Sequence, residues 1–388
     1  MEWVELPNTE LINYMNSLGF ASPGGIFSGS MAWCGGCVKS KGSELITGLG
    51  GHVDYAGNEL YSIRLADDVP SWYQWFLPSY NVGNTSVPNG PYNPDGTPSA
   101  RHSYFSIYFI DARDKVFLFG SVGVWGNGNG GGPNVDSCSY RAGAGPNKNG
   151  SGWDAAGTNP SLPSGYPPET PIVKDSFENV WVFSPWSGNV YLWNQTTNSW
   201  SKPAVIGVSQ GSGEPFAFDS KRNRVVRIAN SPSPAGYVEM ANLSADWQTV
   251  TMNPPLPYGT GQLLYDPVVD CYWFMGYGQG PAKLYQIDPN NWSVIVAPVT
   301  GTVPDNTYVN GDQQFHGRFN YCPELQGLVF MRDSFANVSF IRTAPAPPIQ
   351  PSPPPSPSAS QSSGAIGNIQ PLFVFFLSQL LLLLSMLM

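Results

Sequence analysis

An all-β fold built from repeated small sheets is predicted by three features of the 388-residue sequence. Charged residues make up only 12% of the chain and aromatic residues 13%, so the helix-favouring Lys, Glu and Arg are scarce while core-forming rings are abundant. The chain also has 43 Gly and 38 Pro, which supply turns for many short strands. Apolar segments and Asp-containing turns recur at a nearly constant spacing. A helical bundle is therefore excluded.

The clearest repeat lies in the second half of the chain. Residues 260–298 contain four strand-like segments in two pairs, each pair joined by a turn that begins with Asp-Pro. The preceding stretch has the same order, because Asp219 comes 47 residues before Asp266. Likewise, Trp247 comes 45 residues before Trp292. Four short strands in about 40 residues are the size of one blade of a β-propeller, so a propeller is the predicted fold.

The middle of the chain allows two interpretations. Residues 102–120 predict the first two strands of a blade, and residues 189–203 predict the outer pair of the same blade. Residues 121–175, rich in Gly, Pro and Asn, are then a long insertion within that blade. Alternatively, the apolar segment 179–185 belongs to a degenerate extra blade.

The first and last units complete the count of blades. The first unit ends in a strand at Trp72 or Trp75, and the last ends in NVSFIR without a fourth strand. We expect the N-terminal segment, residues 1–19, to supply this missing strand, since a closed ring leaves no sheet edge exposed. Five blades are recognisable in the sequence, and a total of six or seven is left open. The propeller is expected to span residues 20–343.

A Pro/Ser-rich linker and a hydrophobic tail are predicted after the propeller. Residues 344–371 begin APAPPIQPSPPPSP, which has few backbone donors and favours an extended polyproline conformation. Residues 372–388 form an uncharged apolar tail of 17 residues, whereas a transmembrane helix usually needs about 20. Small residues, a spacer and a terminal apolar tail are typical of the signal for a glycosylphosphatidylinositol (GPI) anchor. A short transmembrane helix is the alternative.

These features predict an extracellular, membrane-anchored protein at the cell surface. Six Asn-x-Ser/Thr sequons agree with a glycoprotein, and they are Asn84, Asn149, Asn194, Asn242, Asn291 and Asn337. The first residues, however, have no basic start followed by an apolar stretch, so either the chain begins downstream of a signal peptide or the surface location is wrong. A net charge of −9 without a Lys/Arg cluster excludes nucleic acid as a partner, and a monomer is expected.

Several motifs resemble those of kelch and galactose-oxidase-like propellers. The matching residues are Gly50-Gly51 with Tyr61 and Trp72, Arg101-His102-Ser103, Phe119-Gly120, and the pairs Tyr191/Trp200, Tyr237/Trp247 and Tyr285/Trp292. The double glycine is clear only once, so the resemblance is to a divergent member of this superfamily. It implies a β-propeller of four-stranded, kelch-like blades.

The histidines are the candidate functional residues. In an antiparallel four-stranded blade, the start of the first strand and the loop between strands two and three lie on one face of the disc. His102 and His316 begin first strands and His52 follows a second strand, in blades that become neighbours in the closed ring, so all three are expected together. The predicted binding site is completed by the residues beside them: Asp54, Tyr55, Arg101 and Arg318.

Three imidazoles could bind copper or zinc, or could hydrogen-bond a sugar hydroxyl. If a metal binds, its ligands are His52, His102 and His316, but hydrogen-bonded residues at strand ends are the simpler interpretation, and no cofactor is assigned. The resemblance implies copper radical oxidase chemistry, in which a Tyr directly precedes a ligand His. This sequence has no Tyr-His dipeptide, so that activity is not expected.

The sequence therefore favours a cell-surface module that binds a glycan or a protein over an enzyme. Trp125, Trp153 and Tyr166 in the insertion suit stacking against sugars, unless they fold back onto the disc. The alternative function is a metal-dependent (copper) oxidase or hydrolase of the galactose-oxidase-like superfamily.

Five cysteines allow at most two disulfides. Cys34 and Cys37, separated by two glycines, predict a tight hairpin disulfide in an oxidising compartment. Cys271 and Cys322 lie near the first hairpins of successive blades and form a second candidate pair. In this prediction Cys138 forms no disulfide.

Overall fold

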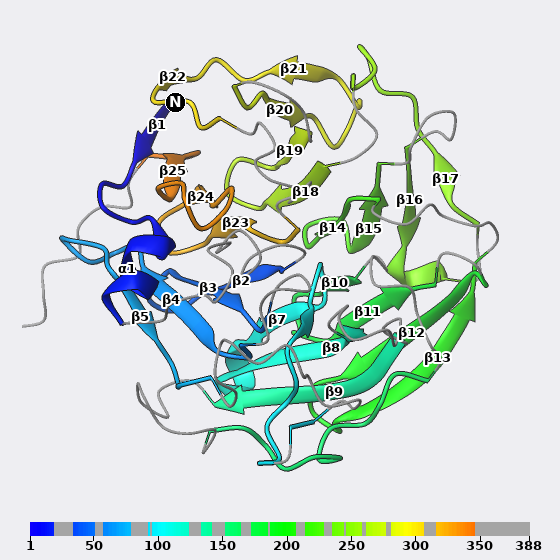
Figure 1. Cartoon of the computed structure of the whole chain (residues 1–388). Coiled ribbons are helices and arrows are strands. Elements are labelled where there is room, and N and C mark those ends of the chain that lie inside the picture. The colour runs from blue at the N-terminus through cyan, green and yellow to red at the C-terminus, as the bar shows by residue number, and fades with distance from the viewer. Residues whose placement is uncertain are drawn as a thin grey trace, which may run out of the picture. The chain divides into compact units, whose positions relative to one another are not determined.

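The innermost strands of six β-sheets surround one axis in the computed structural model (Figure 1). Contacts and a hydrogen bond between successive inner strands continue around this axis, and the last inner strand lies beside the first. The fold is a six-bladed β-propeller. Its compact unit extends over Met1–Pro347. The structure describes residues 1–18, 34–50, 57–78, 92–93, 95–123, 133–141, 152–163, 172–184, 187–206, 214–228, 235–243, 246–257, 261–276, 281–305 and 316–345.

Four blades consist of four antiparallel strands that follow one another from the axis outward. Blade 1 contains β2 (Gly36–Lys39), β3 (Glu44–Gly48), β4 (Leu60–Arg64) and β5 (Trp72–Gln74). Blade 3 contains β10 (Ile172–Lys174), β11 (Val180–Phe183), β12 (Asn189–Asn194) and β13 (Ser199–Val205). Blade 4 contains β14 (Phe216–Asp219), β15 (Arg224–Arg227), β16 (Gly236–Glu239) and β17 (Gln248–Thr249). Blade 5 contains β18 (Gly261–Asp266), β19 (Cys271–Gly276), β20 (Leu284–Ile287) and β21 (Val294–Val296).

Blade 2 differs because its inner strand is interrupted. Both β6 (Arg101–His102) and β7 (Ile107–Ile110) pair with β8 (Lys115–Gly123), and β9 (Pro133–Arg141) pairs with the outer edge of β8. Two 3₁₀ helices lie in loops, namely η2 (Asp111–Arg113) in blade 2 and η3 (Met240–Asn242) in blade 4.

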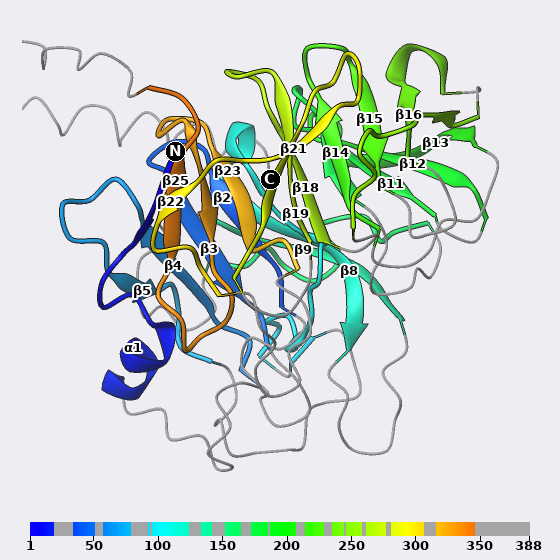
Figure 2. The same cartoon turned by 90° about the horizontal axis from the view of Figure 1, so that it is seen from above.

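The N-terminal strand completes blade 6. This blade contains β23 (Phe319–Cys322), β24 (Gly327–Phe330), β25 (Ser339–Arg342), β1 (Glu2–Glu5) and β22 (Thr300–Gly301). Strand β1 is antiparallel to β25, as expected from the missing fourth strand of the last unit. The short β22 adds a parallel fifth strand. The segment before residue 20 is therefore part of the propeller. Helix α1 (Leu11–Ser17) follows and lies beside β4 and β5 (Figures 1 and 2).

The assignment of residues 189–203 to the blade that starts at 102 needs correction. These residues form β12 and β13 of a separate blade, whose inner pair is β10 and β11. Residues 121–175 are consequently not one insertion, since they include β9 and β10. The alternative of an extra blade around 179–185 is the correct one, and the count of six lies within the range left open.

Apolar residues between adjacent blades form the core. Six buried clusters, one at each junction of two blades, account for most of the buried side chains. Trp193 packs against Phe117 and Phe119 between blades 2 and 3, and Trp3 and Trp273 lie between blades 5 and 6. The aromatic content of the sequence is thus used to join blades, which is where apolar burial stabilises a ring.

All five cysteines are buried thiols, so the two predicted disulfides are wrong. Cys34 Sγ donates a hydrogen bond to the Gly50 carbonyl at 2.8 Å. Burial is the main cause that raises the pKa of both Cys37 and Cys271 to about 12, which makes these thiols unreactive. The cysteines fill the core instead of crosslinking it.

The predicted linker and tail lie outside the described residues, apart from residues 344 and 345. None of the helices in the described ranges is long and apolar enough to cross a membrane.

Candidate functional site

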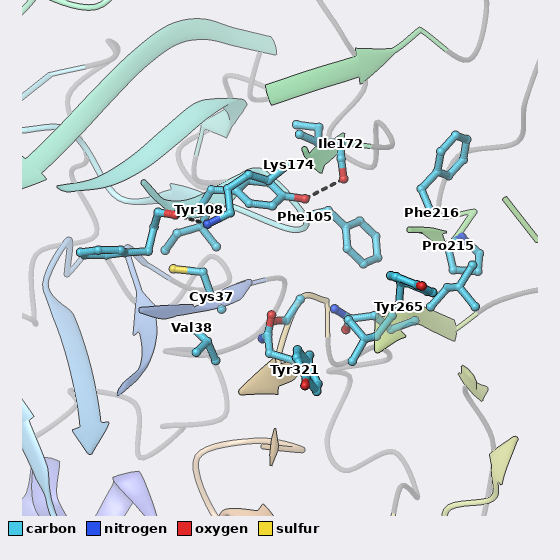
Figure 3. A pocket seen from close by; sticks show the side chains of 18 of the residues that line it. Cys37, Val38, Phe105, Tyr108, Ile172, Lys174, Pro215, Phe216, Tyr265 and Tyr321 are labelled. Carbon is cyan, nitrogen blue, oxygen red and sulfur yellow. Dashed lines mark hydrogen bonds between the residues drawn. The ribbon is translucent and has the colours of Figure 1, made fainter. Parts of the chain in front are cut away.

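A cavity of about 300 Å³ occupies the centre of the ring. Residues from all six blades line it, so the cavity exists only in the closed propeller (Figure 3). Its wall includes six aromatic residues, which are Phe105, Tyr108, Phe109, Phe216, Tyr265 and Tyr321. Small-molecule sites usually measure about 300–1,000 Å³, so this cavity suits a small ligand or the end of a longer one.

The inner strands place the lining residues at different depths of the channel. Lys174 and Tyr321 are partly exposed and lie at or near the ends of β10 and β23. These ends belong to the face formed by the turns between first and second strands, which we term the hairpin face. Gly36 and Gly317 lie at the starts of inner strands, on the opposite face, which we term the strand-start face.

Lys174 is held by three oxygen groups near the hairpin face. Its Nζ donates a hydrogen bond to the Phe109 carbonyl at 2.8 Å and lies 3.7 Å from the Asp111 carboxylate and 3.5 Å from that of Glu178. The Glu178 carboxylate also accepts hydrogen bonds from the backbone N–H groups of Asp111 and Ala112, at 2.9 and 2.6 Å. The lysine charge is thus balanced within the protein and does not require an anionic ligand.

Two tyrosine hydroxyls of the cavity, those of Tyr108 and Tyr265, are anchored and neutral. Tyr108 donates a hydrogen bond to the Ile172 carbonyl at 2.6 Å (Figure 3), and Tyr265 donates one to Asp270 at 2.7 Å. Burial is the main cause that raises the pKa of both phenols well above the usual value. Each oxygen keeps an acceptor lone pair that a ligand hydroxyl can use.

A tight turn in blade 2 brings Phe105 to the cavity. Residues 103–106 interrupt the inner strand, and the Ser106 N–H closes the turn by donating to the Ser103 carbonyl at 2.7 Å. Tyr104 has a φ of 40°, a conformation that costs a bulky residue free energy. Figure 3 shows the Phe105 ring projecting between the side chains of the other blades.

Glycines make room for this turn. A Cβ on Gly35 would stand 1.9 Å from the Tyr104 carbonyl oxygen, and a Cβ on Gly317 would stand 3.5 Å from the same atom. Gly35 also donates its N–H to the Ser103 hydroxyl at 2.8 Å. The backbone at Gly35, where the chain enters blade 1, therefore supports the turn of blade 2, and Gly317 of blade 6 lies at ordinary contact distance from it.

Two of the three histidines lie together at the strand-start face. The ring of Tyr104 lies between them, with centroids 5.7 Å from His102 and 4.9 Å from His316. Both histidines are buried, with 2% and 0% of their surface exposed. Burial, followed by the charges of Arg318 and His102, lowers the pKa of His316 well below its usual value, so this imidazole stays neutral.

The two arginines of the predicted site hold backbone carbonyls. Arg318 donates hydrogen bonds to the carbonyls of Cys34 at 3.1 Å and Arg332 at 2.8 Å, and Arg101 donates one to the Ser99 carbonyl at 3.0 Å. The bond to Cys34 joins blade 6 to the segment that enters blade 1, whereas the other two are contacts within one blade or segment. A ligand-binding role for Arg101, His102, His316 and Arg318 stays a prediction.

The other predicted site residues, His52, Asp54 and Tyr55, lie outside the described ranges. Within the described part of the chain, no group of three or more His, Cys, Asp or Glu side chains is arranged to hold a metal ion.

Sequence reasoning missed the residues that line the channel. Each blade contributes two to four of them, and they share no motif, so only their position on inner strands could have indicated them. Trp153, expected as a sugar-stacking residue, instead packs against Phe76 and Tyr140 at 5.6 and 5.1 Å. It folds back onto the disc, whereas Trp125 and Tyr166 lie outside the described ranges.

No family model and no curated protein matches the sequence. Solved structures of other proteins do match. A structure of YjhT has 10% identity and a TM-score of 0.47, and the match covers 80% of this chain and 93% of that one. A luciferin-regenerating enzyme has 12% identity and a TM-score of 0.43, with coverages of 79% and 90%. No residue role or activity is transferred from either.

The blade topology by itself confirms the fold that the sequence motifs indicate. Four-stranded antiparallel blades follow one another around an axis, and the N-terminal strand closes the last of them. The chain is a six-bladed β-propeller.

Proposed function

We propose that the protein is a glycan-binding module that takes a terminal sugar of its ligand into the central channel. The supporting observation is the composition of the cavity wall: six aromatic residues, two anchored tyrosine hydroxyls and a lysine whose charge is already balanced. Aromatic faces stack on the C–H groups of a sugar, and fixed polar groups orient its hydroxyls.

A glycan array with the purified propeller tests this proposal. Replacing Tyr321 by Ala removes a ring of the cavity wall, so we expect binding to weaken by about tenfold or more. Phe177→Ala is the control, because Phe177 lies on a hairpin turn, 76% exposed and outside the cavity wall, and its loss should leave binding unchanged. Binding that survives Tyr321→Ala, or no binding by the unmodified protein, would count against the proposal.

We also propose that the propeller is displayed at the cell surface, carried by its Pro/Ser-rich linker and anchored through its apolar tail. Release from cells by a phosphatidylinositol-specific phospholipase would support a lipid anchor. Protein that stays on the membrane after this treatment but is exposed to external protease would instead support a spanning tail.

A further inference from the structure

Phe105 is the aromatic residue of the cavity wall whose position core packing does not explain. The other five each belong to, or pack against, one of the apolar clusters between blades: Tyr108, Phe109, Phe216, Tyr265 and Tyr321. Phe105 is in none of the six clusters that the described residues form. Its half-buried ring lies in the channel, with its centroid 5.4 Å from that of His316 (Figure 3).

The turn that carries Phe105 is fixed at both ends. The Ser103 hydroxyl accepts the N–H of Gly35 at 2.8 Å, and the Ser106 carbonyl accepts the N–H of Phe119 at 3.0 Å. Within the turn, the Ser106 hydroxyl donates to the Ser103 carbonyl at 2.5 Å. The Phe105 ring is therefore held in the channel by backbone and hydroxyl contacts instead of by apolar burial.

This placement is maintained against backbone strain. Tyr104 has a φ of 40°, in the left-handed region that a bulky residue rarely adopts. Strained backbone of this kind is typical of sites that contact ligands, where the surrounding structure holds a side chain ready. A rigid ring that packs into no cluster is the arrangement expected of a surface on which a ligand stacks, because little entropy is lost when the ligand binds.

The cavity wall is buried at the strand-start face. The wall residues that lie there are Gly36, Glu214, Gln262 and Gly317, and all four are buried. His316, which the Phe105 ring contacts, is 0% exposed, and Tyr104 beside it is 5% exposed. Solvent therefore has little access to the cavity from this side.

The wall is exposed at the hairpin face. Ser40 directly follows β2 and is partly exposed, as is Tyr321 near the end of β23. Pro323, just after β23, is exposed. The exposure of the wall thus increases from the strand-start face to the hairpin face, which makes the hairpin face the entrance. A pocket with one entrance accepts the end of a chain and excludes an internal segment, which would need a second opening.

We propose that the channel recognises the ends of glycan chains: the terminal sugar enters from the hairpin face and stacks on Phe105, which is the specificity-determining residue at the closed end. The proposal rests on the proposed glycan-binding function and adds to it the direction of entry, the stacking residue and the class of ligand.

Two substitutions of Phe105 test the stacking role. Phe105→Leu keeps an apolar side chain without an aromatic face, so we expect glycan binding to weaken by about tenfold. Phe105→Tyr keeps the ring and should bind like the unmodified protein. Both variants should unfold at the same temperature as the unmodified protein, because the ring belongs to no cluster of the core.

A matched pair of substitutions at the hairpin face tests the entrance. Ser40→Trp adds a large side chain to the cavity wall, so we expect it to weaken glycan binding by about tenfold. Lys41→Trp is the control, because Lys41 is the next residue, is exposed and lies outside the wall, so that binding should be unchanged. Thermal unfolding of both variants shows whether each one is folded.

The four variants and the unmodified protein are compared on one array of linear oligosaccharides attached through their reducing ends. Each oligosaccharide is present with its terminal sugar bare and with that sugar capped by one further, different sugar. We expect the unmodified protein to bind the bare ends and to lose about tenfold or more in binding on capping.

Four results would overturn chain-end recognition on Phe105. They are equal binding of bare and capped chains, unchanged binding by Phe105→Leu, unchanged binding by Ser40→Trp, and a Tm of Phe105→Leu far below that of the unmodified protein, which would make the ring structural. In each of these cases glycan binding itself still stands, whereas failure of the unmodified protein to bind any glycan removes both proposals.

Discussion

Aspartates at the ends of inner strands fix the hairpin turns of three blades. One carboxylate oxygen of Asp175 accepts the N–H groups of Phe177 and Asn179 at 2.8 and 2.9 Å. Asp219 and Asp266 accept two backbone N–H groups each in the same way. This side-chain chemistry explains why Asp recurs at a nearly constant spacing in the sequence. Asp266 is thus the turn residue that its sequence context predicts.

Glu59 is the residue from which a pH dependence of stability is expected. Burial raises its pKa from 4.5 to about 7, and the hydrogen bond donated by Tyr61 at 2.7 Å only partly opposes this effect. Between these two pH values the folded protein keeps a proton that the unfolded chain releases. Stability should therefore fall as pH rises from about 4.5 to about 7, by about 3 kcal/mol, and change no further above that.

Glu59→Gln should remove this component of the pH dependence, because the amide does not titrate. Urea unfolding at pH 5 and pH 8 measures it. Equal loss of stability across this range in both proteins would show that Glu59 is already ionised in the fold at low pH.

At the scale of elements, the interrupted inner strand of blade 2 depends on a glycine of blade 1. Gly35→Ala should destabilise the protein by about 1–3 kcal/mol, because the added Cβ meets backbone, the Tyr104 carbonyl oxygen, at 1.9 Å. Gly36→Ala is the comparison, since its closest contacts, Arg318 Cγ and the Ile46 carbonyl oxygen, both lie at 3.2 Å and need to move by only a few tenths of an ångström. Denaturant midpoints of the two variants check the difference, and a smaller effect at Gly35 would mean that the turn moves freely.

The same elements show what the sequence could and could not predict. Blades 4 and 5 were recognisable because each has an Asp turn at Asp219 or Asp266 and an outer aromatic residue. Blade 3 was merged with blade 2 because its inner strand, Ile172–Lys174, has only three residues and follows a Gly- and Pro-rich stretch. The cavity could not be predicted, because its residues are neighbours only after six separate strands have met.

For the whole molecule, ring closure by β1 is expected to control stability. Trp3 is 1% exposed and packs between blades 5 and 6, whereas Val4, the next residue, is 49% exposed. Trp3→Ala should cost about 3–5 kcal/mol, and Val4→Ala should change little. Thermal unfolding followed by circular dichroism compares them, and similar midpoints would show that the strand is not needed to hold the ring together.

The pairing of β1 with β25 also sets an order of events during synthesis. Strand β1 leaves the ribosome before the other strands of the propeller and has its partner near the far end of the domain, so it must remain without that neighbour while almost every other blade is made. Hairpins between consecutive strands can form as those strands emerge, but the pairing of β1 with β25 can form only after β25 has been synthesised. Until then the nascent chain exposes an unfinished sheet, and chaperones that shield such edges would be expected to associate with it.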